Sequence, residues 1–488
     1  MVFSAHISTS LRRIVSTHTQ RSNWCFQALI VLLLSACASA PNGEQQPTIG
    51  AVDSVTPFAS TYKIPDSSPT IIRSATLLTG TGEQLDNADI VFEAGKITLV
   101  GYQLDAPKGA TEVNGTGLWV TPGIIDVHSH MGVYPNPSVN AHADGNEIVA
   151  PATAKVWAEH SVWPQDPNFE KALAGGVTTA QILPGSANLF GGRGVTLKNV
   201  PSVTMMGMKF PDAPHSLKMA CGENPKRVYG DKGGPGTRMG NMAGYRAAWI
   251  AAKKYDKSWS DYEAKLAKGD KSAEAPLRDL EMDTLRGVLK GDIKIHNHCY
   301  RADEMANMVE LSKEFGYSIT AFHHAVEAYK IAPLLAENEI CAVIWADWWG
   351  FKQEAYDMIR ENAGLIELAK GCAIIHSDDE TQIQRLPQEV GKAMAAANRM
   401  GMQLTPAEVI KWVTSNSAKS IGLDDRIGSL QKGMNADVVL WSGNPLSVYS
   451  QAEKVWIDGA LRFDRSNPDS NHTSDFNLGI ITPEGDRP

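Results

Sequence analysis

Residues 121–130, TPGIIDVHSH, carry the strongest structural signal in this sequence. The apolar run 123–127 predicts a buried β-strand, and two histidines follow it with one residue between them. Because side chains alternate along a strand with a period of two, His128 and His130 are expected on the same face of the strand end. Two imidazoles in that arrangement indicate a metal site, which needs further ligands from other strands.

Seven further apolar runs alternate with helix-like segments after this strand. They cover residues 177–183, 194–200, 216–222, 293–298, 318–324, 340–345 and 372–378. Eight such strands predict an α/β fold, a (β/α)8 barrel over residues 122–423. The active site of such a barrel lies at the carboxyl ends of its strands.

Short β-type runs at both ends of the chain predict a second, smaller unit. Residues 69–121 contain three runs with turn signals, and residues 424–465 contain two more. Neither group has enough strands to cover both of its faces, so we expect both to build one β-sandwich. Residues 466–488 remain as a carboxy-terminal tail.

The first 37 residues have the pattern of a secretory signal. Arginines precede a short apolar run, which is too short to span a bilayer and ends in Leu34-Ser35-Ala36-Cys37. This ending is similar to a bacterial lipobox, which implies Cys37 as the lipidated residue of an exported outer-membrane lipoprotein facing the periplasm. The alternative is a plain cleaved signal. Residues 38–68 are rich in Pro, Ser and Thr and are expected to form a flexible tether.

Composition limits the remaining possibilities. The 488-residue chain is 43% hydrophobic and 20% charged, with a net charge of −9 and no basic block, so a nucleic-acid partner is not expected. Four cysteines outside the leader stand singly in or beside apolar runs. We therefore expect small buried residues there, not a disulfide framework: Cys221, Cys299, Cys341 and Cys372.

Further metal-ligand residues stand at the ends of three later strands. They are His296, His298, His323, His324, His376, Asp378 and Asp379. Together with the first pair they place imidazoles and carboxylates at four of the eight strand ends. One binding site on one rim of the barrel explains all four, and the ligand types suit zinc or a similar divalent metal.

The motifs in this sequence resemble those of the amidohydrolase superfamily, in particular its imidazolonepropionase-like and prolidase-like branch. They are PGIIDVHSH, ALAGGVTT at 172–179, PGSAN at 184–188, the strand ends at His298-Cys299-Tyr300, His324 and Ser377-Asp378, and the segment 414–441. The family usually has Asn-Pro-Ala in the last segment, where this chain has Asn416-Ser417-Ala418. The resemblance covers about residues 70–465.

The resemblance implies a role for each ligand. His128 and His130 would hold one metal, His298 and His324 a second, and Asp378 would bind the first and act as proton acceptor. His296 and His376 lie two residues inside the predicted ligands and are expected to be structural. By alternation along the strand, we expect His323 to point away from the site.

The group that would bridge two metal ions stays open at this point. Two nearby dications need an anion between them, because it offsets their repulsion. Related enzymes use a carboxylated lysine or a glutamate, and SLKMACGENPKR offers Lys218 and Glu223. A site with one metal ion would need neither.

The resulting hypothesis is an amidohydrolase that cleaves a carbon–nitrogen bond, and not an ester bond. The bond would belong to an amide, a peptide or a cyclic amide. A metal lowers the pKa of bound water from about 16 to about 7, and Asp378 would accept the proton. Tyr300 and Arg193 are candidate contacts to a small-molecule or short-peptide substrate. Alternatives are a deaminase on the same barrel and an inactive metal-binding surface lipoprotein. Relatives also suggest a homodimer or higher oligomer.

Overall fold

The computed structural model describes residues 57–348, 350–379 and 381–478, all within one unit, Ala51–Pro488. The predicted signal sequence, Cys37 and the first part of the tether lie outside the described residues, as does the end of the tail. None of the described helices combines the length and the hydropathy that a bilayer crossing requires.

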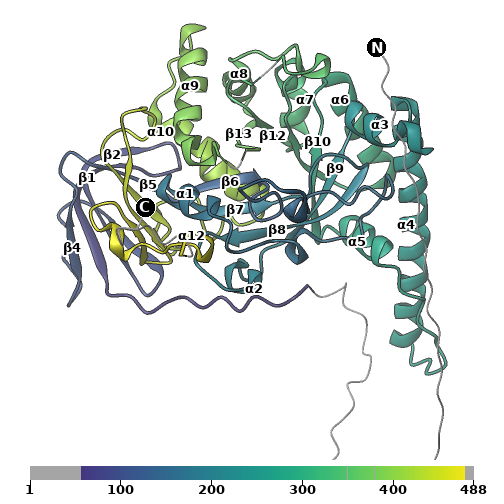
Figure 1. Cartoon of the computed structure of the whole chain (residues 1–488), viewed down its shortest axis with the longest axis horizontal. Helices are drawn as coiled ribbons and strands as arrows, with labels where there is room; N and C mark the ends of the chain where they lie inside the picture. Colours follow the sequence, from purple (N-terminus) through teal and green to yellow (C-terminus); the bar gives the residue numbers. More distant parts are fainter. Residues whose placement is uncertain (1–56, 349, 380, 479–488) are drawn as a thin grey trace, which may run out of the picture. The chain divides into compact units, whose positions relative to one another are not determined.

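Eight strands form the barrel in the order of the sequence, as predicted (Figure 1). They are β6 (Ile124–Ser129), β7 (Val177–Ile182), β8 (Phe190–Lys198), β9 (His215–Ala220), β10 (Ile293–His298), β11 (Ile319–His323), β12 (Cys341–Ile344) and β13 (Cys372–Ile375). Most positions on these strands are buried, because barrel strands are covered by helices outside and by side chains inside.

The prediction that all eight strands run parallel is wrong for β8. This strand pairs antiparallel with both of its neighbours, β7 and β9. Residues 183–189 alone connect β7 to β8, and a parallel connection needs a crossover of about a dozen residues or more. The chain therefore turns back directly, and side chains of β8 cannot be assigned to the barrel mouth by the rule for parallel strands.

The first and last strands of the barrel are joined at their carboxyl ends. The backbone N–H of Asp378, just beyond β13, donates to the carbonyl of His128 at 3.1 Å. The Ser377 hydroxyl donates to the Asp126 carboxylate at 2.5 Å. Residues about 250 positions apart in the sequence thus meet at one end of the barrel.

Helices surround the barrel and cap its connections. They are α1 (Asn168–Ala174), α2 (Met205–Met208), α3 (Glu223–Tyr229), α4 (Arg238–Ala267), α5 (Leu280–Leu289), α6 (Ala302–Phe315), α7 (Ala332–Glu337), α8 (Asn362–Leu368), α9 (Leu386–Arg399), α10 (Pro406–Val409), α11 (Ser415–Ser420) and α12 (Asp475–Leu478). In α6, Met305, Met308, Val309 and Ser312 are buried at helical spacing, and Gly316 ends the helix with φ of 72°.

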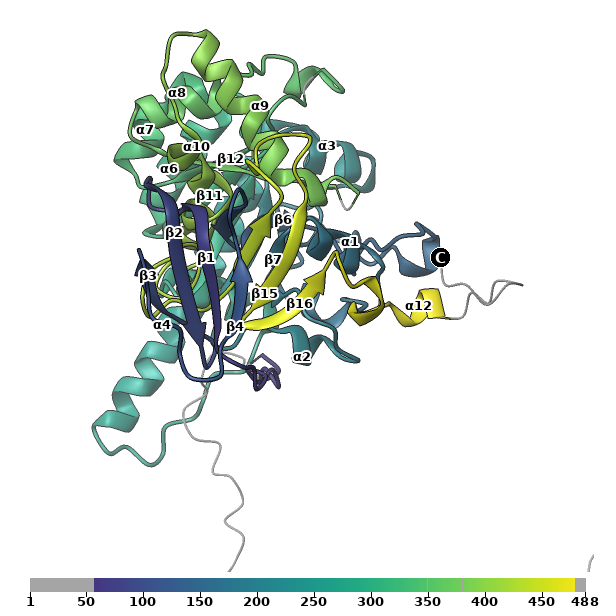
Figure 2. The ribbon, with the colours of Figure 1, turned by 90° about the vertical axis from the view of Figure 1, so that its left-hand side faces the viewer.

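Strands from both chain ends form a second sheet, also of eight strands (Figure 2). They are β1 (Thr70–Leu78), β2 (Gln84–Glu93), β3 (Lys96–Gly101), β4 (Thr111–Asn114), β5 (Trp119–Pro122), β14 (Val438–Trp441), β15 (Ala452–Ile457) and β16 (Ala460–Asp464). Antiparallel pairing of β14 with β5 joins the two ends. The shared sheet agrees with the expected composite unit. The domain boundaries and the sandwich form stay predictions, since hydrogen bonds connect all the strands into one sheet.

The prediction that the cysteines form no disulfides is wrong. Cys341 and Cys372 are paired in register at the start of β12 and β13 and form one disulfide. Cys221 and Cys299 follow β9 and β10, which are also neighbours, and form the second. The sequence places these cysteines far apart, and only the adjacency of the strands brings their sulfur atoms together.

Candidate metal centre

Seven of the chain's 13 histidines gather inside the barrel near the carboxyl ends of its strands: His128, His130, His296, His298, His323, His324 and His376. His128 is central among them, with ring centroids 4.4 Å from His324 and 4.7 Å from His323. The convergence of strand ends that the sequence predicted is therefore present.

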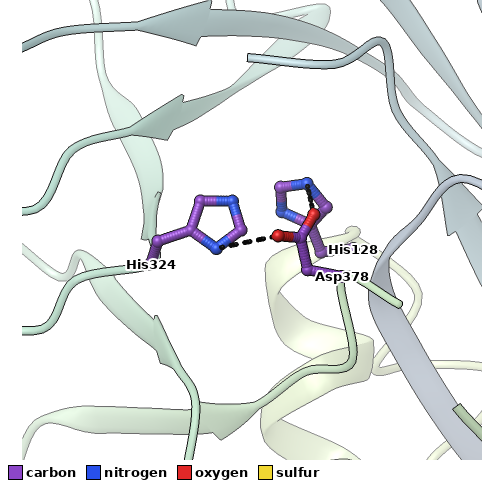
Figure 3. A group of neighbouring side chains, drawn as sticks. All are labelled: His128, His324 and Asp378. Carbon is purple, nitrogen blue, oxygen red and sulfur yellow. Dashed lines mark ion pairs between the residues drawn. The ribbon is translucent and has the colours of Figure 1, made fainter. Parts of the chain in front are cut away.

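Asp378 lies among three of these imidazoles, two of which, those of His128 and His324, are drawn with it in Figure 3. Its Oδ1 is 3.1 Å from His130 Nε2 and 3.3 Å from His128 Nε2, and its Oδ2 is 3.7 Å from His324 Nδ1. Among the described residues, His128, His324 and Asp378 form the group whose ligand atoms lie close enough to hold one ion, within 4.8 Å of one another. We call His128, His130, His324, Asp378 and Lys218 the mouth cluster.

The orientation of His130 shows why this cluster fits a cation. Its Nδ1 is 2.8 Å from the Leu183 carbonyl, which only accepts hydrogen bonds, so Nδ1 carries a proton. Its Nε2 faces the Asp378 carboxylate, which is an acceptor, at 3.1 Å. A contact of this length is favourable when a proton or a metal ion lies between the two atoms. Fixing one imidazole nitrogen on a carbonyl is also how proteins orient metal-binding histidines.

Two members of the mouth cluster have left-handed backbone conformations, which set the direction of their side chains. His324 has φ of 56° and Asp378 has φ of 53°, values that are uncommon for residues other than glycine. Such conformations cost on the order of 1–3 kcal/mol each and concentrate at functional sites. At His324 this conformation interrupts the alternation of side chains along β11.

The prediction that His323 points away from the site is wrong for that reason. Its Nδ1 lies 2.7 Å from Nδ1 of His128, and its Nε2 lies 2.7 Å from Nδ1 of His296. Burial lowers the pKa of each of these rings, to about 3 for His296. His323 thus supports His128 from inside the barrel, and His296 is the buried, hydrogen-bonded residue that was expected.

Lys218 enters the cluster from β9. It is fully buried, and its Nζ is 3.0 Å from Nε2 of His128. Burial lowers the pKa of Lys218 to about 7, although the charge of Asp378 opposes the shift. A lysine at this depth has an amine that is neutral for a large part of the time near neutral pH.

Glu223, the other candidate for a bridging anion, is placed differently. It begins α3, its side chain is one-third exposed, and its Oε1 is 3.6 Å from Lys352 Nζ. Its backbone N–H donates to the carboxylate of Glu354. The structure therefore brings Lys218, and not Glu223, against the histidines.

His298 lies at the edge of the cluster. Its ring centroid is 4.8 Å from that of His324 and 4.5 Å from that of Tyr300. Its Nε2 is 3.4 Å from the amide nitrogen of Asn224, and its buried Nδ1 has no hydrogen-bond partner among the described residues. This nitrogen is one of several buried polar atoms that are unpaired among the described residues.

His376 is also buried without a hydrogen bond from either ring nitrogen, within the part of the chain that the structure describes. Its ring centroid is 4.7 Å from that of His324 and 5.3 Å from that of His128. Burial lowers the pKa of His376 to about 3, so its ring is neutral. The ring packs against those of two predicted ligands, and the structural role expected for His376 stays a prediction.

A cavity of about 720 Å³ opens directly on the mouth cluster. His130, His324 and Asp378 line its floor. Tyr300, predicted to contact substrate, lines its wall, and burial raises the pKa of the Tyr300 hydroxyl. Trp345, Trp348 and Phe351 also belong to the aromatic wall.

The placement of Arg193 in a substrate site is not supported. Its Nε donates to the Thr284 hydroxyl on α5 at 2.8 Å, and its guanidinium lies 4.4 Å from the ring centroid of Trp157. It is buried on the side of β8 that faces the helix and does not line the cavity. Arg193 pairs with Leu217 of β9, and its side chain lies on the outer face of β8 against α5, which accounts for the error.

The fold and the mouth cluster define a barrel protein with a candidate divalent-metal centre. A model of the amidohydrolase family matches residues 385–463. The solved structure of an amidohydrolase from Thermotoga maritima MSB8 is 35% identical, with a TM-score of 0.74, and the match covers 81% of this chain and 100% of that one. This chain therefore belongs to the amidohydrolase superfamily, as its motifs predicted.

Two relatives in sequence have more specific names. Amidohydrolase tasK of Hapsidospora irregularis is 32% identical over 430 residues, which are 81% of this chain and 43% of that protein. This chain thus spans less than half of tasK. An imidazolonepropionase of Mesorhizobium japonicum is 23% identical over 386 residues, 73% of this chain and 87% of the enzyme.

Proposed function

We propose that this protein is a metal-dependent hydrolase that cleaves a carbon–nitrogen bond in an amide, a short peptide or a cyclic amide. The observation that carries the proposal is the convergence of His128, His324 and Asp378, whose ligand atoms lie within 4.8 Å of one another at the floor of an open cavity. Membership of the amidohydrolase superfamily and the similarity to an imidazolonepropionase support the reaction class.

The ligands divide into two groups. His128, His130 and Asp378 would hold a first divalent ion, with zinc as the expected metal, because imidazole and carboxylate are ligands that zinc takes. His298 and His324 would hold a second. A bound divalent ion would supply a water that ionises near neutral pH.

Lys218 is the proposed bridge between the two ions. Its neutral amine would form an N–C bond to carbon dioxide and release one proton, which gives a carbamate anion in place of a cation. An anion there would offset the repulsion between two dications. The position of Nζ at 3.0 Å from His128 Nε2 supports this assignment over Glu223.

Asp378 is the proposed proton carrier. Its carboxylate would accept a proton from the attacking water and return it to the nitrogen that departs. The join between its backbone and that of His128 holds it in place. The Tyr300 hydroxyl lies on the cavity wall, with its pKa raised, and would donate a hydrogen bond to the substrate.

The test combines metal analysis with turnover. We expect the purified protein to contain divalent metal and to hydrolyse members of a panel of dipeptides, N-acyl amino acids and lactams, with no activity in Asp378→Asn. Release of ammonia from an aminated ring would indicate a deaminase instead. Full metal occupancy without turnover of any compound would indicate a binding protein.

The bridge has its own test. Intact mass under native conditions should show one added carbon dioxide, and Lys218→Ala should lose the second metal ion and its activity. A short-chain carboxylic acid should partly restore activity in Lys218→Ala, because it supplies the missing anion. Full activity of that variant without added acid would disprove the assignment.

We also propose that the protein is exported and anchored through a lipid on Cys37. The two disulfides support export, because such bonds persist in oxidising compartments. Labelled fatty acid should be incorporated into the wild-type protein and not into Cys37→Ala, and the variant should leave the membrane fraction. Labelling of both proteins alike would contradict the proposal.

A further inference from the structure

We infer that Lys352 forms a carboxylate-binding subsite in the cavity, so that the substrate is an amide or peptide with a free carboxylate and an apolar side chain. The inference rests on the proposed function and specifies its substrate class. It is drawn from the charges, contacts and aromatic surface of the cavity wall.

The cavity wall has one lysine or arginine side chain within the described part of the chain. That side chain is Lys352, and the carboxylates that line the cavity are those of Asp347 and Asp378. Asp347 is neutralised by Lys392 at 2.8 Å, and Asp378 belongs to the mouth cluster. An anionic group of a ligand would therefore find its partner at Lys352.

Lys352 is held in place and still has hydrogen-bonding capacity. Its Nζ donates to the side-chain oxygen of Asn224 at 3.0 Å and lies 4.5 Å from the ring centroid of Tyr300. An ammonium has three N–H donors, so one bond to Asn224 leaves others for a ligand. A side chain fixed in advance loses less entropy when it binds.

The neighbouring backbone is anchored as well. The carboxylate of Glu354 is buried, accepts the N–H of Glu223 and pairs with Arg238. These contacts fasten the segment that carries Lys352 to the start of α3 and the start of α4. The ammonium is thus held by the scaffold.

Asn224 links this subsite to the candidate metal centre. Its side-chain oxygen accepts from Lys352, and its side-chain nitrogen lies 3.4 Å from Nε2 of His298. A carboxylate bound to Lys352 would therefore lie one side chain away from a predicted metal ligand. That proximity suits a carboxylate close to the bond that is cleaved, as in a dipeptide or an N-acyl amino acid.

The aromatic wall supplies the apolar half of the subsite. Trp345 stacks on His324 with centroids 4.5 Å apart, and Trp348 stacks on Trp345 at 5.6 Å. Phe351 meets Trp345 edge-on. Aromatic faces of this kind favour an aromatic or large aliphatic group.

Glu223 makes the inference sharper, because it competes for the same ammonium. Its Oε1 lies 3.6 Å from Lys352 Nζ. If a substrate carboxylate binds Lys352, Glu223→Gln should lower the KM for acids by removing the competing negative charge. A loss of kcat for acids and amides alike would instead assign Glu223 to the metal centre and overturn this placement.

The main experiment compares N-acyl-phenylalanines and X-Phe dipeptides with the same compounds in carboxamide form. We expect the wild-type holoenzyme to prefer acids over amides in kcat/KM by about 10- to 100-fold, the range for a hydrogen-bonded charge pair. Lys352→Met should bring this ratio close to one, and Lys352→Arg should restore part of it. Lys330→Met removes a surface lysine that pairs with Asp357 and Glu327, and should keep the wild-type ratio.

The outcomes separate the two proposals. Hydrolysis with the same acid-to-amide ratio in wild type and Lys352→Met would overturn the subsite and keep the hydrolase. If no compound is cleaved, thermal-shift titration with the same acids measures their binding and so tests the subsite without turnover. If the wild-type protein binds these acids and Lys352→Met binds them more weakly, the result would support the subsite and contradict the hydrolase. If the protein binds none of the acids, both proposals would be overturned.

Discussion

Two buried charged clusters in this molecule differ in how their charges are matched. In the first, Lys198 of β8 lies 2.9 Å from Asp458 and 3.6 Å from Asp437, and the Tyr62 hydroxyl donates to Asp458 at 2.6 Å. We call these four residues the Lys198 cluster. It joins the barrel to the second sheet, and a cation lies between two carboxylates of the same chain.

The mouth cluster has no such internal match. Imidazole nitrogens face one carboxylate, and Lys218 faces an imidazole. Both clusters are buried, so burial alone does not separate structure from function. The difference is that a cation of the same chain lies between the two carboxylates of the Lys198 cluster, whereas the imidazole nitrogens and the carboxylate of the mouth cluster fit an added cation.

The largest expected effect is on activity in the mouth cluster. Asp378→Asn should lower kcat/KM by about 10²- to 10⁴-fold, because the amide cannot accept a proton. The free energy of unfolding should change by less than about 1 kcal/mol if the exchange is locally tolerated. Steady-state kinetics and urea denaturation measure the two quantities. Unfolding of the variant without an activity effect in the folded fraction would make this cluster structural.

The next effect is on stability in the Lys198 cluster. Lys198→Met leaves two buried carboxylates without their cation and should cost about 3–5 kcal/mol of unfolding free energy. Specific activity of the folded fraction should match the wild type. Urea denaturation followed by fluorescence gives the stability, and a variant as stable as the wild type would remove the contrast between the clusters.

The two disulfides should differ in the same way, because one should affect stability alone and the other both stability and activity. Cys341→Ser with Cys372→Ser, at the amino ends of β12 and β13, should cost about 2–4 kcal/mol of stability with little change in kcat/KM. Cys221→Ser with Cys299→Ser should cost a similar amount and also lower kcat/KM, because Cys299 lies between His298 and Tyr300. Denaturation and kinetics on both double variants check this, and equal kinetics in the two would disprove the second part.

Metal removal should have a smaller effect on stability, and this effect should depend on the mouth cluster and not on the Lys198 cluster. At a metal concentration about 100 times its Kd, chelation should lower the unfolding free energy by about 2.7 kcal/mol. In the Lys198→Met variant, chelation should lower the unfolding free energy by the same amount as in the wild type, in addition to the cost of the substitution. In His130→Ala, chelation should lower it by less. Calorimetry with and without chelator measures it. An undiminished chelator effect in His130→Ala would place the metal elsewhere.

The smallest effect concerns pH and a histidine outside both clusters. Burial lowers the pKa of His215, at the amino end of β9, from 6.5 to about 3. The unfolded chain therefore binds the proton more readily, so stability is full above about pH 6.5 and falls as the pH decreases toward 3. Between about pH 7 and pH 5 the loss should be about 2 kcal/mol. His215→Gln should reduce this acid sensitivity in urea denaturation, and an unchanged slope would contradict the shift.

Periodicity and motifs in the sequence predicted a large part of this molecule. Eight apolar runs predicted the eight barrel strands, since a buried strand needs apolar residues whatever its partners are. The period of two placed His128 and His130 together, and the strand-end positions predicted that Asp378 and His324 would join them. These features depend on local geometry, which neighbouring residues encode.

Tertiary structure decided the features that depend on distant neighbours or single torsion angles. The packing of α5 against β8 holds Arg193 on the outer face of the strand, away from the cavity, and a left-handed φ at His324 left His323 inside the barrel beside His128. Adjacent strands joined cysteines that the sequence keeps apart. Sequence spacing fixes which face of a strand a residue occupies, whereas only the packed chain fixes which strands are neighbours and where alternation is interrupted.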